Sequence, residues 1–75
     1  MAKVKNRLTV GSKVLVKTLS LSFSDYKNLA GEVREVHGEF AVVAIPRAKI
    51  SAEDLSELKR DGDKALAQVK ITDLV

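Results

Sequence analysis

The sequence predicts a mainly β fold: a five-stranded, strongly curled sheet with one short α-helix inserted before the last long strand. Apolar residues lie on both sides of His37-Gly38, which is typical of two strands joined by a tight turn. Apolar side chains recur at every second position from Ala65 to Ile71, as in a half-buried strand. Between these strands, Ile50 to Gly62 carries the start and stop signals of a helix.

The length and composition of the chain limit what it can do. Its 75 residues form one small domain without room for a deep active-site cleft. It has no cysteine, which excludes disulfides and thiolate chemistry and fits a reducing compartment. No apolar run approaches the roughly 20 residues of a membrane span, and the N-terminal residues lack the apolar core of a secretory signal. We therefore expect a soluble, cytoplasmic protein.

The net charge of +3 is unevenly distributed along the chain. Residues 1–17 hold no acid and five bases, which are Lys3, Lys5, Arg7, Lys13 and Lys17. Residues 51–75 hold six acids and four bases. We expect residues 1–7 to form a flexible basic arm and residues 8–75 to form the single domain. The basic segment could contact phosphates or an acidic protein surface, and a simple solvated terminus is the alternative.

The first strand begins near Lys13 and must change face. Its apolar residues fall on two parities, Val14 and Val16 on one and Leu19, Leu21 and Phe23 on the other. Since one core cannot bury both sets along a straight strand, we expect a bulge or bend near Lys17-Thr18. Residues 19–29 are then predicted to form a long loop or ribbon with Tyr26 at its tip. Tyr26 is either a binding aromatic or a half-buried anchor of this loop.

The central hairpin, residues 30–46, is expected to bend. Val33 and Val36 are three positions apart, so a bulge or an early turn is needed to point both at one core. The strand after Gly38 is apolar at nearly every position, which favours the middle of the sheet, with Val42 as its most central buried residue. His37, the only histidine, is expected to be a turn residue rather than a catalytic base or a metal ligand.

A helix is predicted over Ser51–Arg60. The signals are Ser51 as N-cap, Asp54 for a capping box, Ile50 and Leu55 for a hydrophobic staple, Lys59 and Arg60 for the C-terminal end, and Gly62 for a left-handed stop. Only Leu55 and Leu58, with Ile50, give this helix an apolar side, so it should lie on the sheet or cover an open end of it. After the last long strand, Thr72-Asp73 should turn the chain so that Leu74-Val75 pairs with the first strand.

Three segments resemble an SH3-like small barrel of the KOW type. They are Val10–Val16, the G-x-V-x-x-V pattern of Gly31–Val36, and the closing turn and strand of Ile71–Val75. This resemblance is shared with KOW domains of transcription and ribosomal proteins, with translation-factor barrels, and with barrel-shaped accessory subunits of photosystem I and of ferredoxin-thioredoxin reductase. The chain departs from the KOW pattern by lacking glycine in its first loop and by inserting the helix at residues 51–60.

Motifs for catalysis, metal binding or cofactor binding are not found. The sequence has no glycine-rich phosphate loop, no nucleophile elbow and no paired Cys/His spacing. We expect a non-catalytic binding module without a cofactor, a membrane contact or a small-molecule substrate, as a monomer or weak homo-oligomer.

Two functions remain open. The first is binding of nucleic acid, RNA or DNA, through Lys3, Lys5, Arg7, Lys13, Lys17, Arg34, Arg47 and Lys49, with Phe23 and Tyr26 as stacking groups. The second is a protein-interaction or assembly subunit of a larger complex, which would bind through the loop at residues 19–29 and the helix at residues 51–60.

Overall fold

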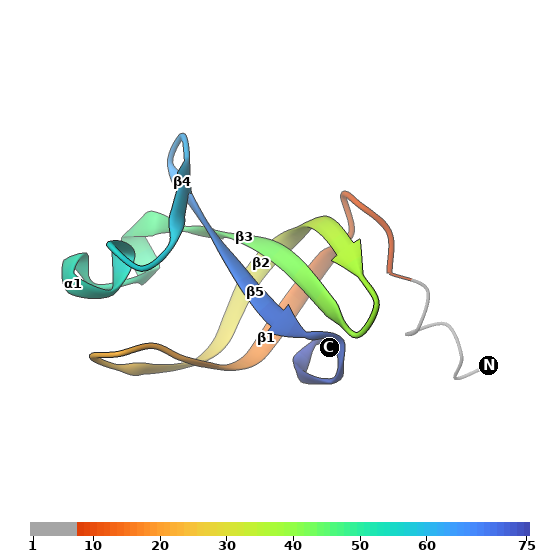
Figure 1. Cartoon of the computed structure of the whole chain (residues 1–75), viewed down its shortest axis with the longest axis horizontal. Helices are drawn as coiled ribbons and strands as arrows, with labels where there is room; N and C mark the ends of the chain where they lie inside the picture. Colours follow the sequence, from red (N-terminus) through yellow and green to blue (C-terminus); the bar gives the residue numbers. More distant parts are fainter. Residues whose placement is uncertain (1–7) are drawn as a thin grey trace.

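Five antiparallel strands form one sheet in the computed structural model, which describes residues 8–75 (Figure 1). In chain order the elements are β1 (Lys13–Ser20), β2 (Asp25–His37), β3 (Phe40–Pro46), the 3-10 turn η2 (Arg47–Lys49), α1 (Ala52–Leu55), β4 (Lys59–Asp61), β5 (Lys64–Lys70) and the 3-10 turn η3 (Ile71–Asp73). The strands are arranged in the order β1-β2-β3-β5-β4. The prediction of a mainly β chain with five strands and little helix is confirmed.

The first two strands change face together. Their ladder keeps one register on both sides of Asn28, whose backbone is left-handed with φ of 56°. Asparagine is one of the few residues that adopt this conformation readily. Val16 and Leu19, three positions apart, are therefore both buried, and the predicted bend near Lys17-Thr18 is confirmed.

The segment predicted as a loop or ribbon from residue 19 to 29 is a β-hairpin arm. Leu19 pairs with Tyr26, and the loop itself is limited to residues 21–24. Tyr26 therefore lies within β2. Its predicted place at the tip is wrong, because the ladder continues beyond the face change, and Phe23 lies in the tip instead.

The central hairpin turns at Gly38-Glu39, where Gly38 has φ of 60°. The register shifts between Val33 and Glu35, which is the predicted bulge. Beyond it Val36 pairs with the buried Ala41 and so shares the core face, but it lies near the end of the hairpin and stays 38% exposed. The bulge is confirmed, whereas full burial of both valines is not.

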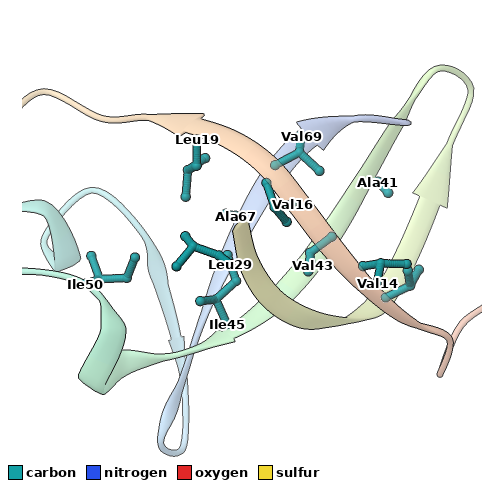
Figure 2. Close-up of a cluster of buried hydrophobic side chains, with 11 residues drawn as sticks. Val14, Val16, Leu19, Leu29, Ala41, Val43, Ile45, Ile50, Ala67 and Val69 are labelled. Carbon is teal, nitrogen blue, oxygen red and sulfur yellow. The ribbon is translucent and has the colours of Figure 1, made fainter. Parts of the chain in front are cut away.

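The core lies between β1, β2, β3 and β5 and also receives Ile50 (Figure 2). Its buried members are Val14, Val16, Leu19, Leu29, Val33, Ala41, Val43, Ile45, Ile50, Ala67 and Val69. Val43 is fully buried and Val42 is only half-buried, so the expectation that Val42 is the central position is wrong by one residue. An apolar run without alternation does not tell which parity faces the core.

Gly31 allows β2 to pass unusually close to β3. A Cβ atom at this position would lie 2.4 Å from Val43 Cγ1 and 2.8 Å from the Ala44 carbonyl oxygen. Both distances are below van der Waals contact, so any side chain would push the strands apart. The glycine that begins the sequence motif thus permits the tight coiling of the sheet.

The helix is shorter than predicted. It begins after Ser51, as expected, but ends at Leu55. Lys59 and Arg60 belong to β4, which pairs with β5, and Gly62, with φ of 65°, lies in the turn between them. The prediction that the helix extends to Arg60 is therefore wrong. The Asp-Gly-Asp sequence that suggested a helix stop is also a hairpin turn signal, and here strand pairing prevails.

The C-terminal residues return to β1, as predicted. The Leu15 N–H donates to the Val75 carbonyl at 3.1 Å, and the Val75 N–H donates to the Leu15 carbonyl at 2.9 Å. Leu74 forms a bridge with Val16. This pairing covers only the last two residues after η3, and the five strands do not form a closed barrel.

Candidate functional site

Titratable side chains do not form a metal-binding group among residues 8–75. Within this range no three histidine, cysteine, aspartate or glutamate side chains lie close enough to hold an ion. His37 Nε2 lies 2.6 Å from Glu35 Oε1, and both side chains are largely exposed. A pair in open solvent lacks the enclosed surroundings and the oriented third group of a catalytic centre. Over the same residues, no helix has the length and apolar character needed to cross a membrane.

Asp54 joins α1 to the hairpin arm through a buried hydrogen-bond network. Its side chain is 0% exposed and is the only buried charged one in the part of the chain that the structure describes. Asp54 Oδ2 accepts hydrogen bonds from the Tyr26 hydroxyl at 2.7 Å and from the Ser51 hydroxyl at 3.2 Å, and Oδ1 accepts one from the Phe23 N–H at 2.9 Å. The Tyr26 oxygen in turn accepts the Ser51 N–H at 3.0 Å. These bonds make burial of the carboxylate possible.

The network keeps Asp54 ionised. Burial raises the pKa of its carboxyl group, but hydrogen bonds from Tyr26, Phe23, Ser51 and Ser24 stabilise the anion and outweigh this effect. The net result is a pKa below the ordinary value of 3.8. At neutral pH the arm is therefore attached to α1 by charge-assisted hydrogen bonds, which are stronger than neutral ones.

A second carboxylate of the α1 segment holds the tip of the arm. Glu57 Oε2 accepts a hydrogen bond from the Ser22 N–H at 3.1 Å. The side chain of Phe23 is nevertheless 68% exposed, although its own N–H is bonded to α1. We call residues 21–26 and 51–57 the arm–helix unit. The two segments that the sequence suggested as a protein-binding surface thus lie together, with one exposed aromatic ring.

Sequence reasoning did not find this network. It assigned Asp54 to a capping box with Ser51, but the Ser51 side chain bonds no backbone N–H of the helix and donates to the carboxylate instead. Tyr26 and Asp54 are 28 positions apart, so no local pattern connects them. The only available signal was a polar residue at a helix position next to apolar ones.

The predicted phosphate-binding residues lie in different surroundings. Lys3, Lys5 and Arg7 lie outside the described residues. Lys13 and Lys17 are exposed on β1 and share a parity, with about 13 Å between their Cα atoms at the usual strand rise. Arg34 forms an ion pair with Asp61 of β4, which reduces its availability to a ligand.

The remaining predicted bases follow β3. Arg47 is half-buried in η2, and its N–H donates to the Asp63 carbonyl at 3.0 Å. Lys49 is exposed at the end of η2 and lines a surface hollow of about 310 Å³ together with Lys27 of β2. Lys27 was not among the predicted residues, because the sequence alone does not show that β2 starts beside η2.

None of the seven lysines among residues 8–75 has an acidic partner, and four of them lie on neighbouring elements. Among residues 8–75, only Arg34 and His37 have a carboxylate oxygen within 4.0 Å. We define the basic surface as Lys13, Lys17, Lys27 and Lys49, from β1, β2 and η2. Lys17 is followed by Thr18, which pairs with Lys27 of β2, and Lys27 shares the hollow with Lys49.

Residues 8–75 have no net charge of their own. Ten of the 13 basic residues and all ten acidic residues lie within residues 8–75, so these cancel and the excess of +3 belongs to residues 1–7. Any attraction to a polyanion must therefore depend on the N-terminal segment and on the local arrangement of lysines.

Comparison with known proteins gives no relative for this chain: no family model, no curated protein and no solved structure matches it.

Proposed function

We propose that this chain is a small, non-catalytic nucleic-acid-binding module of SH3-like topology, which contacts the phosphate backbone of RNA or DNA through the basic surface. The order of the connections supports the topology. A long hairpin arm follows the first strand, a two-residue turn follows the second, and a 3-10 turn precedes a short last pairing with β1. These connections agree with those expected from the SH3-like resemblance of the sequence, whereas α1 between β3 and β4 is an insertion relative to a plain barrel.

The observation that carries the proposal is the set of unpaired lysines on the basic surface. A surface lysine gains little from an intramolecular ion pair, but an array of them on adjacent strands can follow a run of phosphates. Residues 1–7, with their three positive charges, precede this surface in the chain and add to the attraction. Phosphate contacts of this kind position a protein on nucleic acid without reading its sequence.

The test is the salt dependence of binding. Fluorescence anisotropy with labelled single-stranded RNA, single-stranded DNA and duplex DNA should show affinity that falls steeply between low and moderate salt. The double variant Lys13→Gln, Lys17→Gln should bind every sequence more weakly by a similar factor and reduce the salt slope by about two phosphate equivalents.

A matched control removes two charges from the far edge of the sheet. Lys59 and Arg60 are exposed on β4, and β1 and β4 are the opposite edges of the sheet order. The variant Lys59→Gln, Arg60→Gln should leave the salt slope unchanged. If wild-type protein shows no salt-dependent binding to any of the three probes, the nucleic-acid proposal is wrong.

A specific observation favours a second candidate, an assembly subunit that binds another protein through the arm–helix unit. Phe23 is 68% exposed on a loop whose backbone is held by two carboxylates, so its ring projects from a backbone that is held in place. Rigid aromatic side chains are typical anchors of protein interfaces. A stoichiometric partner whose binding is lost in Phe23→Ala and is insensitive to salt would favour this candidate over nucleic acid.

A further inference from the structure

The hollow beside Lys27 and Lys49 arises from the way β3 leaves β2. The ladder between these strands begins at Glu32 and Ala44, and Pro46 at the end of β3 has no N–H with which to extend it. β2 nevertheless continues to pair with β1 as far as Asp25. The departure of β3 opens a recess between the start of β2 and η2, lined by Lys27, Asn28, Leu29, Ala30, Pro46 and Lys49.

Both lysines are attached to rigid backbone. Lys27 pairs with Thr18 across the arm. Lys49 is followed by the buried Ile50, whose N–H donates to the Arg47 carbonyl at 3.1 Å and closes the 3-10 turn. The two lysines therefore border the recess from two elements whose backbone is held in place, so that only their side chains need to be ordered to bind a shared anion.

The lining contains donors and no acid. Besides the lysines it includes Asn28, whose exposed side chain carries an amide donor next to its left-handed backbone. No carboxylate lines the hollow, and none of residues 8–75 places one within 4.0 Å of either lysine nitrogen. An anion would meet attraction without local competition.

We propose that this hollow binds a phosphate group, with Lys27 and Lys49 supplying positive charge and Asn28 a hydrogen bond. The non-bridging oxygens of a phosphate are arranged tetrahedrally around phosphorus, whereas the two oxygens of a carboxylate lie in one plane with its carbon, so donors from three directions fit a phosphate better. The inference rests on the proposed function for the source of the phosphate, which is then a backbone phosphodiester. A free phosphate monoester offers the same chemistry and is the other source.

The experiment is a titration of the full, 15N-labelled chain followed by amide chemical shifts. The probes are inorganic phosphate, a short single-stranded RNA, and sodium glutamate as a carboxylate, all at matched ionic strength. We expect phosphate and RNA to shift the amides of residues 27–30 and 49 in a saturable way, and glutamate to shift them far less.

Three variants make the test specific. Lys27→Gln, Lys49→Gln should weaken phosphate binding by about tenfold or more, in line with the loss of two charge-assisted contacts. Asn28→Gly keeps a residue that tolerates φ of 56° and removes only the amide, so it should weaken binding by a smaller factor. Lys59→Gln, Arg60→Gln changes the net charge equally and should leave phosphate binding unchanged.

The outcomes separate this inference from the proposed function. If Lys27→Gln, Lys49→Gln binds RNA as wild type does and RNA shifts amides outside the hollow, phosphate binding in the hollow is overturned and the nucleic-acid proposal stands. Saturable phosphate shifts without any RNA binding support the hollow, assign it to free phosphate and overturn the proposed function. Shifts of equal size with glutamate overturn the assignment to phosphate, and no shifts with any probe overturn both.

Discussion

The arm–helix unit and the basic surface both include parts of the hairpin formed by β1 and β2, yet their charged groups are used in opposite ways. In the arm–helix unit, two carboxylates accept hydrogen bonds from the loop at residues 21–24 and from Tyr26. On the basic surface, four lysines extend into solvent without a partner in the described chain. The difference shows which charges maintain the fold and which are available to a ligand.

The largest expected effect is that of removing the buried carboxylate. Asp54→Ala should lower the melting temperature more than any other change in the two regions, because the Phe23 N–H loses its acceptor and the Tyr26 hydroxyl loses its shorter, charge-assisted bond and keeps only Ser51 Oγ at 3.1 Å. Amide hydrogen exchange at Phe23 should become faster as the arm detaches. Glu53→Ala, an exposed acid on the same helix, is the control and should be nearly silent. Equal melting temperatures for the two variants would show that the core alone holds the arm.

Removal of one donor should have a smaller effect. Tyr26→Phe keeps the ring and deletes the hydroxyl that bonds Asp54 and accepts the Ser51 N–H. We expect a loss of about 1 to 2 kcal/mol in the free energy of unfolding, measured by chemical denaturation. Ser51→Ala should cost less, because the Asp54 bond to Ser51 is the longest of the three. A larger loss for Ser51→Ala would show that the serine is the main support of the helix start.

Acid should weaken the same unit by a modest amount. The folded-state pKa of Asp54 lies below 3.8, so the carboxylate contributes stability that is complete above the unfolded-state pKa and is lost as the pH falls through the folded-state pKa. Below about pH 4, the stability of wild-type protein should therefore fall more steeply than that of Asp54→Asn. Parallel stability curves for the two proteins in this range would contradict the assignment.

The smallest effect on stability belongs to the basic surface. Lys13→Gln, Lys17→Gln removes two exposed charges without carboxylate partners, so the free energy of unfolding should stay within about 0.5 kcal/mol of wild type. Chemical denaturation and nucleic-acid binding should be measured on the same variant. We expect its affinity for nucleic acid to fall and its free energy of unfolding to stay the same. A clear loss of stability would mean that these lysines contribute to the fold.

Features set by neighbouring residues could be predicted from the sequence. The turn at Gly38, the bulge after Val33 and the alternation of β5 each depend on a few adjacent positions, and all are present. The end of the helix could not be predicted, because the residues after Leu55 satisfy either a helix or a hairpin, and pairing with β5 decides between them. The choice between Val42 and Val43 likewise depends on which face of the sheet is covered.

The candidate site was less accessible to prediction than the fold. Charge alone predicts Lys13, Lys17 and Lys49 as binding residues. Lys27 joins them only because the start of β2 lies beside η2 in the structure, where Lys27 and Lys49 line the same hollow. Arg34 was counted as available, but the curled sheet brings Asp61 to it. In each case the deciding contact joins residues more than 20 positions apart, which no local pattern reports.

The pairing of Leu15 with Val75 has a consequence for the kinetics of folding. These residues are 60 positions apart, so their hydrogen bonds close nearly the whole domain as one loop. Loop closure costs conformational entropy before any bond is gained, and chains dominated by such contacts fold slowly. Until the last two residues dock, the outer edge of β1 is open at Leu15 and Val16, and an open edge is a template for pairing with another chain. The docking that closes this long loop therefore also covers the edge of β1 at Leu15 and Val16.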